Sequence, residues 1–166
     1  MPDAGSRCGH SIDGGPSTVI HGVEHTAISV PDLRVAIDFY CGVLGFELES
    51  ESGWPKGVAE LDALVGLAES ASEVAMLRMG ETRIEIFQYE SPEPRPQDLE
   101  FRVCDHGLTH FCLAVTGIED EYARLVGAGV VFNAPPVELG ASICAYGRDP
   151  FGNVFELKQD RSEARA

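Results

Sequence analysis

Residues 21–30 read HGVEHTAISV, and residues 106–115 read HGLTHFCLAV. Both fit the pattern His-Gly-(Val/Leu)-x-His-x-x-(Ile/Leu)-x-Val, and the second copy begins 85 positions after the first. Successive side chains of a strand point to opposite faces, so His25 and His110 share a face with small residues while large aliphatic side chains gather on the other. The repeat therefore predicts two copies of one strand, each with a packed face and an open face.

The same order of elements follows each copy. Apolar residues at helical spacing come first, with Asp32 as the expected N-cap of the first helix, and each helix leads to a short strand and a closing hairpin. The expected helices begin near Leu33 and Ile118, the short strands cover about 45–51 and about 129–133, and the hairpins turn at Gly80-Glu81 and at Asp149-Pro150-Phe151-Gly152.

These elements predict an α+β protein, in which two tandem β-α-β-β-β modules form a curved mixed sheet around a metal-binding cleft. Residues 52–72 have no counterpart in the second half, and with Trp54 they form either a lid over the cleft or an ordinary surface excursion. The expected boundaries are a disordered tail at 1–20, the first module at 21–90, a proline-rich linker at 91–105, the second module at 106–160 and a tail at 161–166.

One carboxylate lies late in each half between two large apolar residues, where residues 84–86 read Ile-Glu-Ile and residues 155–157 read Phe-Glu-Leu. If the apolar neighbours pack on the helices, Glu85 and Glu156 point to the same open faces as the repeated histidines. A sheltered carboxylate has to be paired, protonated or bound to a metal. A histidine early and a glutamate late, in both halves, therefore predict four ligands that meet around one metal ion.

Composition narrows the range of partners. The chain has 166 residues and a formal net charge of −15. A surface this acidic repels phosphate backbones and anionic lipid, so we expect neither nucleic acid nor a membrane as partner. The five cysteines form no CxxC pair, and Cys112 and Cys144 fall inside apolar runs, which favours reduced, mostly buried thiols in a cytoplasmic protein.

Four stretches together resemble the vicinal oxygen chelate superfamily, which includes glyoxalase I, methylmalonyl-CoA epimerase, extradiol dioxygenases and bleomycin-resistance proteins. They are VEHTAISVPDLRVAIDFYCGVLGFEL, GETRIEIFQ, LTHFCLAV and DPFGNVFEL. The resemblance covers about residues 22–160 and implies a pair of β-α-β-β-β modules around one divalent ion (Ni, Co, Mn, Fe or Zn). Carried over by position, it implies as metal ligands the same residues reached above: His25, Glu85, His110 and Glu156.

The resemblance implies a metal-dependent lyase, isomerase or epimerase, which chelates a small substrate through vicinal oxygens and removes a proton next to a carbonyl. Glu156 would be the catalytic base, with Glu85 as its partner; a separate carboxylate is the other option, and Glu60, Glu69 and Glu73 lie where it is expected. Arg83 either binds an anionic substrate group or forms a salt bridge.

Two other readings stay open at the level of sequence. One is an Fe(II) extradiol dioxygenase, against which a fourth protein ligand counts, and the other is a metal-free drug-binding protein, which needs no such ligands. We expect a homodimer, and the modules can pair either within one chain or between two chains.

Overall fold

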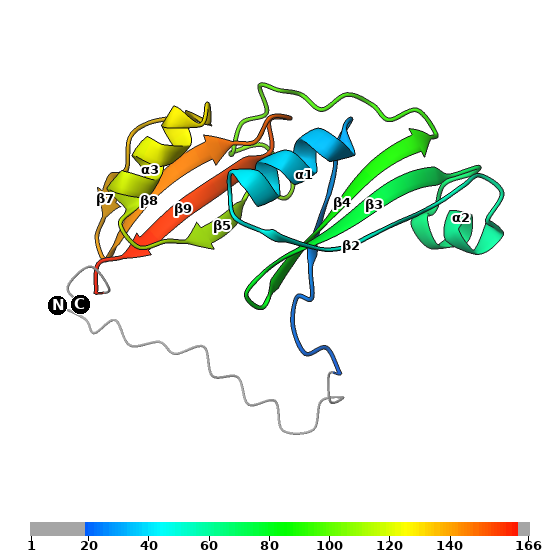
Figure 1. Ribbon diagram of the computed structural model, residues 1–166, viewed down its shortest axis with the longest axis horizontal. Coiled ribbons are helices and arrows are strands. Elements are labelled where there is room, and N and C mark those ends of the chain that lie inside the picture. Colours follow the sequence, from blue (N-terminus) through cyan, green and yellow to red (C-terminus); the bar gives the residue numbers. More distant parts are fainter. Residues whose placement is uncertain (1–18, 163–166) are drawn as a thin grey trace.

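The structure is a computed structural model that describes residues 19–162, so residues 1–18 and 163–166 of the expected tails lie outside the described residues. Both modules have the predicted β-α-β-β-β order, and each contains one additional element, α2 in the first and β7 in the second (Figure 1). The first module consists of β1 (Thr26–Ser29), α1 (Leu33–Gly42), β2 (Glu47–Trp54), α2 (Ala59–Val65), β3 (Ala71–Met79) and β4 (Thr82–Ser91). The second consists of β5 (Phe111–Ala114), α3 (Ile118–Gly127), β6 (Val131–Phe132), β7 (Val137–Leu139), β8 (Ser142–Arg148) and β9 (Val154–Asp160).

Each module forms its own sheet. The first sheet has the order β1-β4-β3-β2 and the second has the order β5-β9-β8-β6, with β7 also paired to β8. The first strand of each module runs parallel to the last, and the other pairings are antiparallel. The α+β class and the mixed, curved sheets are therefore confirmed, although the described strands form two sheets and not one continuous sheet.

The repeated strands are shorter than the sequence pattern suggests. His25 and His110 directly precede β1 and β5, which contain four residues each. The parallel ladders begin at the pairs Thr26↔Ile84 and Phe111↔Phe155, close to where β4 and β9 themselves begin. The histidines thus lie beside the first residues of the partner strands β4 and β9, at the same end of each sheet.

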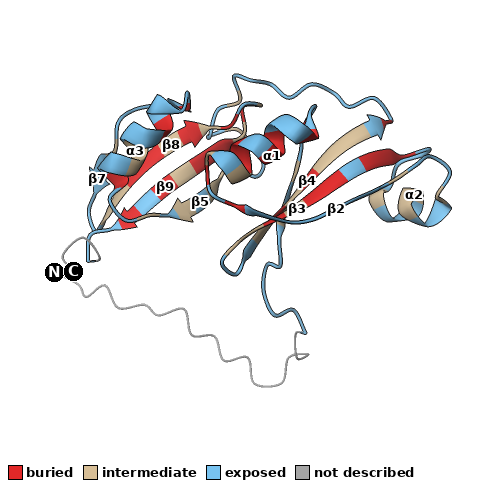
Figure 2. Ribbon diagram, viewed as in Figure 1, coloured by how far each residue is buried: buried red, intermediate tan, exposed pale blue. Residues whose placement is uncertain are grey.

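Helix α1 joins the two modules. Its apolar face contacts the first sheet, and the rings of Phe39 and Tyr40 lie 6.5 Å from Phe155 and 6.2 Å from Phe111 in the second sheet. The Tyr40 hydroxyl also donates a 3.0 Å hydrogen bond to the buried carboxylate of Asp149. One apolar core consequently runs from the first sheet through α1 to the second sheet, and the buried residues follow this path (Figure 2).

A glutamine side chain fastens the start of the helix to the last strand in both modules. Gln88 Oε1 accepts the Leu33 N–H at 2.6 Å, and Gln159 Oε1 accepts the Ile118 N–H at 2.8 Å. These amides lack a partner inside the helix, so an acceptor from the sheet satisfies them. Asp32 is confirmed as the N-cap of α1, because its side chain accepts the Val35 N–H at 3.0 Å.

Candidate metal centre

The side chains of Glu85 and Glu156 project from the face of each sheet that is opposite the helices. Ile84 and Ile86 are fully buried in the core, and Glu85 between them points the other way. In β9 the carboxylate of Glu156 is placed in the same manner between two buried apolar neighbours. The prediction of an open face with one glutamate in each module agrees with this geometry.

The first module brings its predicted histidine and glutamate together. His25 Nε2 lies 3.2 Å from Glu85 Oε2. The other ring nitrogen, Nδ1, lies 2.5 Å from the Glu24 carboxylate. The hydrogen bond from His25 is the main reason why the pKa of Glu24 falls below its ordinary value. The imidazole is therefore held through Nδ1 while Nε2 faces Glu85.

The second module repeats this arrangement with different supporting chemistry. His110 Nε2 lies 3.2 Å from Glu156 Oε2, and His110 Nδ1 forms a 2.9 Å hydrogen bond with Thr109 Oγ1. In both modules the residue before the histidine fixes Nδ1 and the glutamate of the last strand lies beside Nε2. The Tyr146 ring, 5.0 Å from that of His110, supports the imidazole from the side.

This geometry suits a metal ligand pair. Two neighbouring ligands, each about 2.1 Å from one ion and at right angles to each other, lie about 3 Å apart. A ligating histidine usually has its second nitrogen held by a hydrogen bond, which fixes the tautomer and the ring orientation. Both His–Glu pairs have these properties, so the donor set fits a divalent ion that accepts nitrogen and oxygen ligands.

The four predicted ligands form two pairs and not one cluster. Within residues 19–162 no three His, Cys, Asp or Glu side chains come together in a way that could hold a metal ion. His25 meets Glu85 in one module, and His110 meets Glu156 in the other. A four-ligand site would thus need a second chain or a closer approach of the two modules.

Glu156 has neighbours that the sequence did not single out as parts of the site. Cys112 lies opposite it on β5 and Tyr146 lies opposite it on β8. Partial desolvation of the thiols, together with the hydrogen bond to Glu156 and its negative charge, raises the pKa of Cys112 and of Cys144 to about 11. Both groups are therefore neutral thiols at pH 7. The register of the β8–β9 hairpin places Tyr146 beside Glu156, and the sequence alone did not give this register.

One prediction about the cysteines is wrong. Cys144 is buried as expected, whereas Cys112 is exposed. The apolar run that contains Cys112 belongs to an edge strand, and Cys112 shares the open face of that strand with His110. An apolar run therefore did not imply burial at this position.

Other expected site residues are placed differently. Arg83 binds Glu49 at 2.7 Å and Glu24 at 3.1 Å, so the salt-bridge reading applies and the guanidinium is already engaged by two acids. Glu73 pairs with Gln88, whose side chain contacts the start of α1. Glu73 therefore lies on the helix-covered face of the sheet, opposite the face that carries Glu85. Glu73 is thus a poor choice for a separate base in the same chain.

The unduplicated segment folds on itself at the far end of the first sheet (Figure 1). Asp62 accepts hydrogen bonds from the backbone of Glu69 and from the backbone and hydroxyl of Ser70, which closes the loop after α2. Trp54 at its start lies on the open face of the sheet, because it pairs with Ser72 and Ser72 pairs with Tyr89. The segment thus contributes an aromatic side chain to this face, while α2 stands beside the sheet.

A cavity of about 60 Å³ lies where β1 approaches β5, and His110, Thr26, Ile28 and Phe111 are among its lining residues. It is large enough for water and too small for an organic substrate. None of the helices within residues 19–162 is long and apolar enough to cross a membrane.

Comparisons with known proteins agree with this architecture. A sequence model of the Glyoxalase/Bleomycin resistance protein/Dioxygenase superfamily matches residues 22–157. The chain is 30% identical over 148 residues to a 2-epi-5-epi-valiolone epimerase from Actinomyces sp, with 81% of this chain and 77% of that protein covered. It is 29% identical over 148 residues to a probable lactoylglutathione lyase from Synechocystis sp., with 84% and 95% covered.

Among solved structures, a glyoxalase family protein from Bacillus cereus has a similar fold, with a TM-score of 0.79, 21% identity, and coverage of 88% of this chain and 98% of that one. The family match spans both modules, including all four candidate ligands. Together with the twofold β-α-β-β-β architecture, it shows that the chain belongs to the glyoxalase/bleomycin resistance protein/dioxygenase superfamily.

Proposed function

We propose that the protein is a divalent-metal-dependent enzyme of the lyase, isomerase or epimerase type, which chelates a small substrate through two adjacent oxygens and removes a proton next to a carbonyl. The observation that carries the proposal is the repeated pair: in both modules an imidazole Nε2 lies 3.2 Å from a glutamate oxygen. In both, the preceding side chain holds the other nitrogen. The relatives named as an epimerase and as a lyase support this class of chemistry.

We further propose that each site is shared by two copies of the chain. His25 and Glu85 of one protomer would meet His110 and Glu156 of its partner. The separation of the two pairs within residues 19–162 supports this arrangement, because each module of one chain brings together only half of the proposed ligands. A twofold dimer would then contain two equivalent sites.

A bound divalent ion would supply Lewis acidity that stabilises the negative charge left on the substrate after proton loss. The residues of the chain would position the ligands and accept the proton. Glu156 is the base we propose, because its side chain is 14% exposed against 23% for Glu85. The more sheltered carboxylate is better shielded from bulk water, and Glu85 would act as its partner on the other side.

Metal analysis of the purified protein tests the proposal directly. We expect one tightly bound divalent ion per chain in the wild type, and we expect Glu85→Gln to lose most of it. The matched control is Glu51→Gln, since Glu51 is on the same sheet but pairs with Arg34 of α1. Equal metal content in wild type and both variants would contradict the assignment of Glu85.

The two alternative functions give different outcomes in the same measurements. Bound iron together with oxygen consumption in the presence of a catechol would favour a dioxygenase. A protein without metal and without affinity for Ni²⁺, Co²⁺ or Zn²⁺ would favour a drug-binding protein. For the proposed chemistry, the substrates to be tried with the bound metal are methylmalonyl-CoA, glutathione hemithioacetals and 2-epi-5-epi-valiolone.

A further inference from the structure

Three aromatic rings form a wall on the open face of the first sheet. The ring of Trp54 lies 6.2 Å from Phe87 and 5.9 Å from Tyr89, and Phe87 and Tyr89 stack at 5.6 Å. All three residues are partly exposed. Aromatic rings that gather outside the core and keep contact with solvent usually mark a binding surface.

The wall begins beside the proposed metal ligand Glu85. Phe87 and Tyr89 follow it on the same strand at alternate positions, so all three side chains leave the same face. The rise of a strand places the Phe87 backbone about 7 Å from that of Glu85. The negative charge of Glu85 also contributes, after burial, to the raised pKa of Tyr89.

The wall is fixed in place and lies over small or apolar neighbours. Ser72, between Trp54 and Tyr89 in the sheet, is buried, and so is Val74 opposite Phe87. Trp54 Nε1 donates a 2.9 Å hydrogen bond to Ser70 Oγ, so the indole has a defined orientation. A rigid wall loses little conformational freedom when a ligand binds to it.

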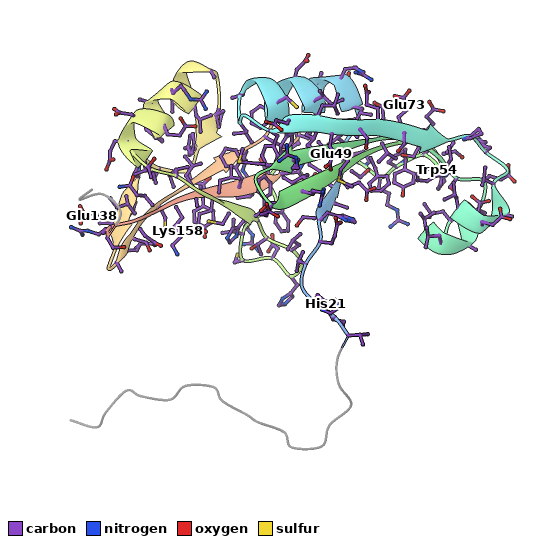
Figure 3. The ribbon with its side chains drawn as sticks, turned by 60° about the horizontal axis from the view of Figure 1, so that its bottom comes forward. His21, Glu49, Trp54, Glu73, Glu138 and Lys158 are labelled. Carbon is purple, nitrogen blue, oxygen red and sulfur yellow. The ribbon has the colours of Figure 1, made fainter. Side chains whose placement is uncertain are left out.

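The open face of β9, the last strand of the second module, carries no such rings. The positions on β9 that correspond to Phe87 and Tyr89 are Lys158 and Asp160, which form a 3.6 Å ion pair. Trp54 and Lys158 lie in different modules, toward opposite ends of the molecule (Figure 3). Packing of a β-α-β-β-β module therefore does not require aromatic residues at these positions.

We propose that the substrate carries an aromatic or other flat conjugated ring, which stacks on Trp54, Phe87 and Tyr89 while two adjacent oxygens of the same molecule meet the metal ion. This inference rests on the proposed function. The short distance along β4 between Glu85 and Phe87 places the ring close to the chelating oxygens.

Two hydroxamates test the proposal, because both chelate a metal through two adjacent oxygens and differ in the group attached. Acetohydroxamate carries a methyl group and benzohydroxamate carries a phenyl ring. We expect the Zn²⁺-loaded wild-type protein to bind benzohydroxamate at least about 10-fold more tightly, as measured by titration calorimetry. Trp54 is the only tryptophan of the chain, and Zn²⁺ is a closed-shell ion, so benzohydroxamate should also change the tryptophan fluorescence with the same affinity.

Variants separate stacking from chelation. Phe87→Leu and Tyr89→Leu should lower the benzohydroxamate preference to about 3-fold or less while leaving the affinity for acetohydroxamate unchanged, and Tyr89→Phe should keep the preference. The matched control is Tyr122→Leu, since Tyr122 is a partly exposed aromatic residue of α3 that packs on Phe132. It should retain the wild-type preference.

The possible failures are distinguishable. If the protein holds no Zn²⁺ and binds neither hydroxamate, the proposed function is wrong. If acetohydroxamate binds but benzohydroxamate binds equally well, or the leucine variants keep the preference, the aromatic wall has another role. A change of oligomeric state in the leucine variants without a change in preference would also overturn the inference, because the wall would then be covered by a second copy of the chain.

Discussion

Removing one His–Glu pair at a time tests whether each metal ion is shared between two chains. The double variant His25→Ala/Glu85→Gln loses the pair of the first module, and His110→Ala/Glu156→Gln loses the pair of the second. The members of each pair lie 3.2 Å apart within one module, so each variant removes half of the expected ligands and leaves the other half intact. We expect neither variant alone to retain Co²⁺ through gel filtration, because two ligands hold an ion far more weakly than four.

Mixing the two variants should restore metal binding if sites are shared. When the chains are unfolded together and refolded in equal amounts, about half of the dimers contain one chain of each kind. In such a dimer, one site receives all the altered residues and the other receives all the native ones. The mixture should therefore bind about one quarter of the Co²⁺ that the wild type binds, as counted per chain by metal analysis.

A Co²⁺ content near zero in a mixture of folded, dimeric protein would refute the shared site, since sites built within single chains cannot be restored by mixing. The matched control is a mixture of His25→Ala with Glu85→Gln. Both changes affect the same pair, so no dimer in that mixture has an unaltered site under either arrangement. Circular dichroism and gel filtration establish that the variants fold and associate.

Three further substitutions test the packing that supports the site. Gln159→Leu leaves the buried N–H at the start of α3 without its acceptor and should cost about 1–3 kcal/mol in urea unfolding, whereas no loss would contradict the fastening role. Tyr40→Phe removes the 3.0 Å bond to Asp149 and should cost about 1.5–3 kcal/mol. Burial raises the pKa of Tyr40. The stabilisation is therefore complete below pH about 10 and is lost as the pH rises. A difference in the free energy of unfolding between wild type and Tyr40→Phe that stays constant above that pH would argue against this hydrogen bond. Gly147→Ala places a Cβ 2.7 Å from the ring of Phe155 and should cost about 1–3 kcal/mol in thermal unfolding, and a variant as stable as the wild type would contradict this close contact.

The sequence predicted the module because the same pattern of apolar and polar residues occurs in both halves of the chain. Each last strand has one glutamate between two large apolar residues, and the structure buries Ile84 and Ile86 while Glu85 points to the other face. The turns were also readable, because Gly80 adopts a φ of 58° between paired strand ends and Gly152 N–H bonds to Asp149 O at 3.1 Å. The faces of the strands and the positions of the turns both depend on residues that are close together in the sequence.

The sequence did not predict how the two modules pack against each other, because no local rule determines this packing. Residues 92–110 join the last strand of the first module to the first strand of the second. Fully extended, this connection reaches about 60 Å, which is enough for pairing within a chain or between chains. Helical spacing predicted an apolar face for α1, but it could not show that Phe39 and Tyr40 on this helix also contact the second sheet. The four candidate ligands could therefore be proposed from the sequence, whereas their grouping could not.

A single irregular residue in β2 explains why the sequence did not predict the aromatic wall. Leu48 of β2 pairs with Leu77, on the face that packs against α1. In a regular strand Trp54, six positions later, would share that face. The register shifts between Leu48 and Ser50, and this bulge turns Trp54 to the open face, opposite Ser72. One additional residue in an edge strand thus moves the only tryptophan of the chain from the helix-covered side of the sheet to the side that carries Glu85, and alternation read from the sequence would have placed it on the wrong face.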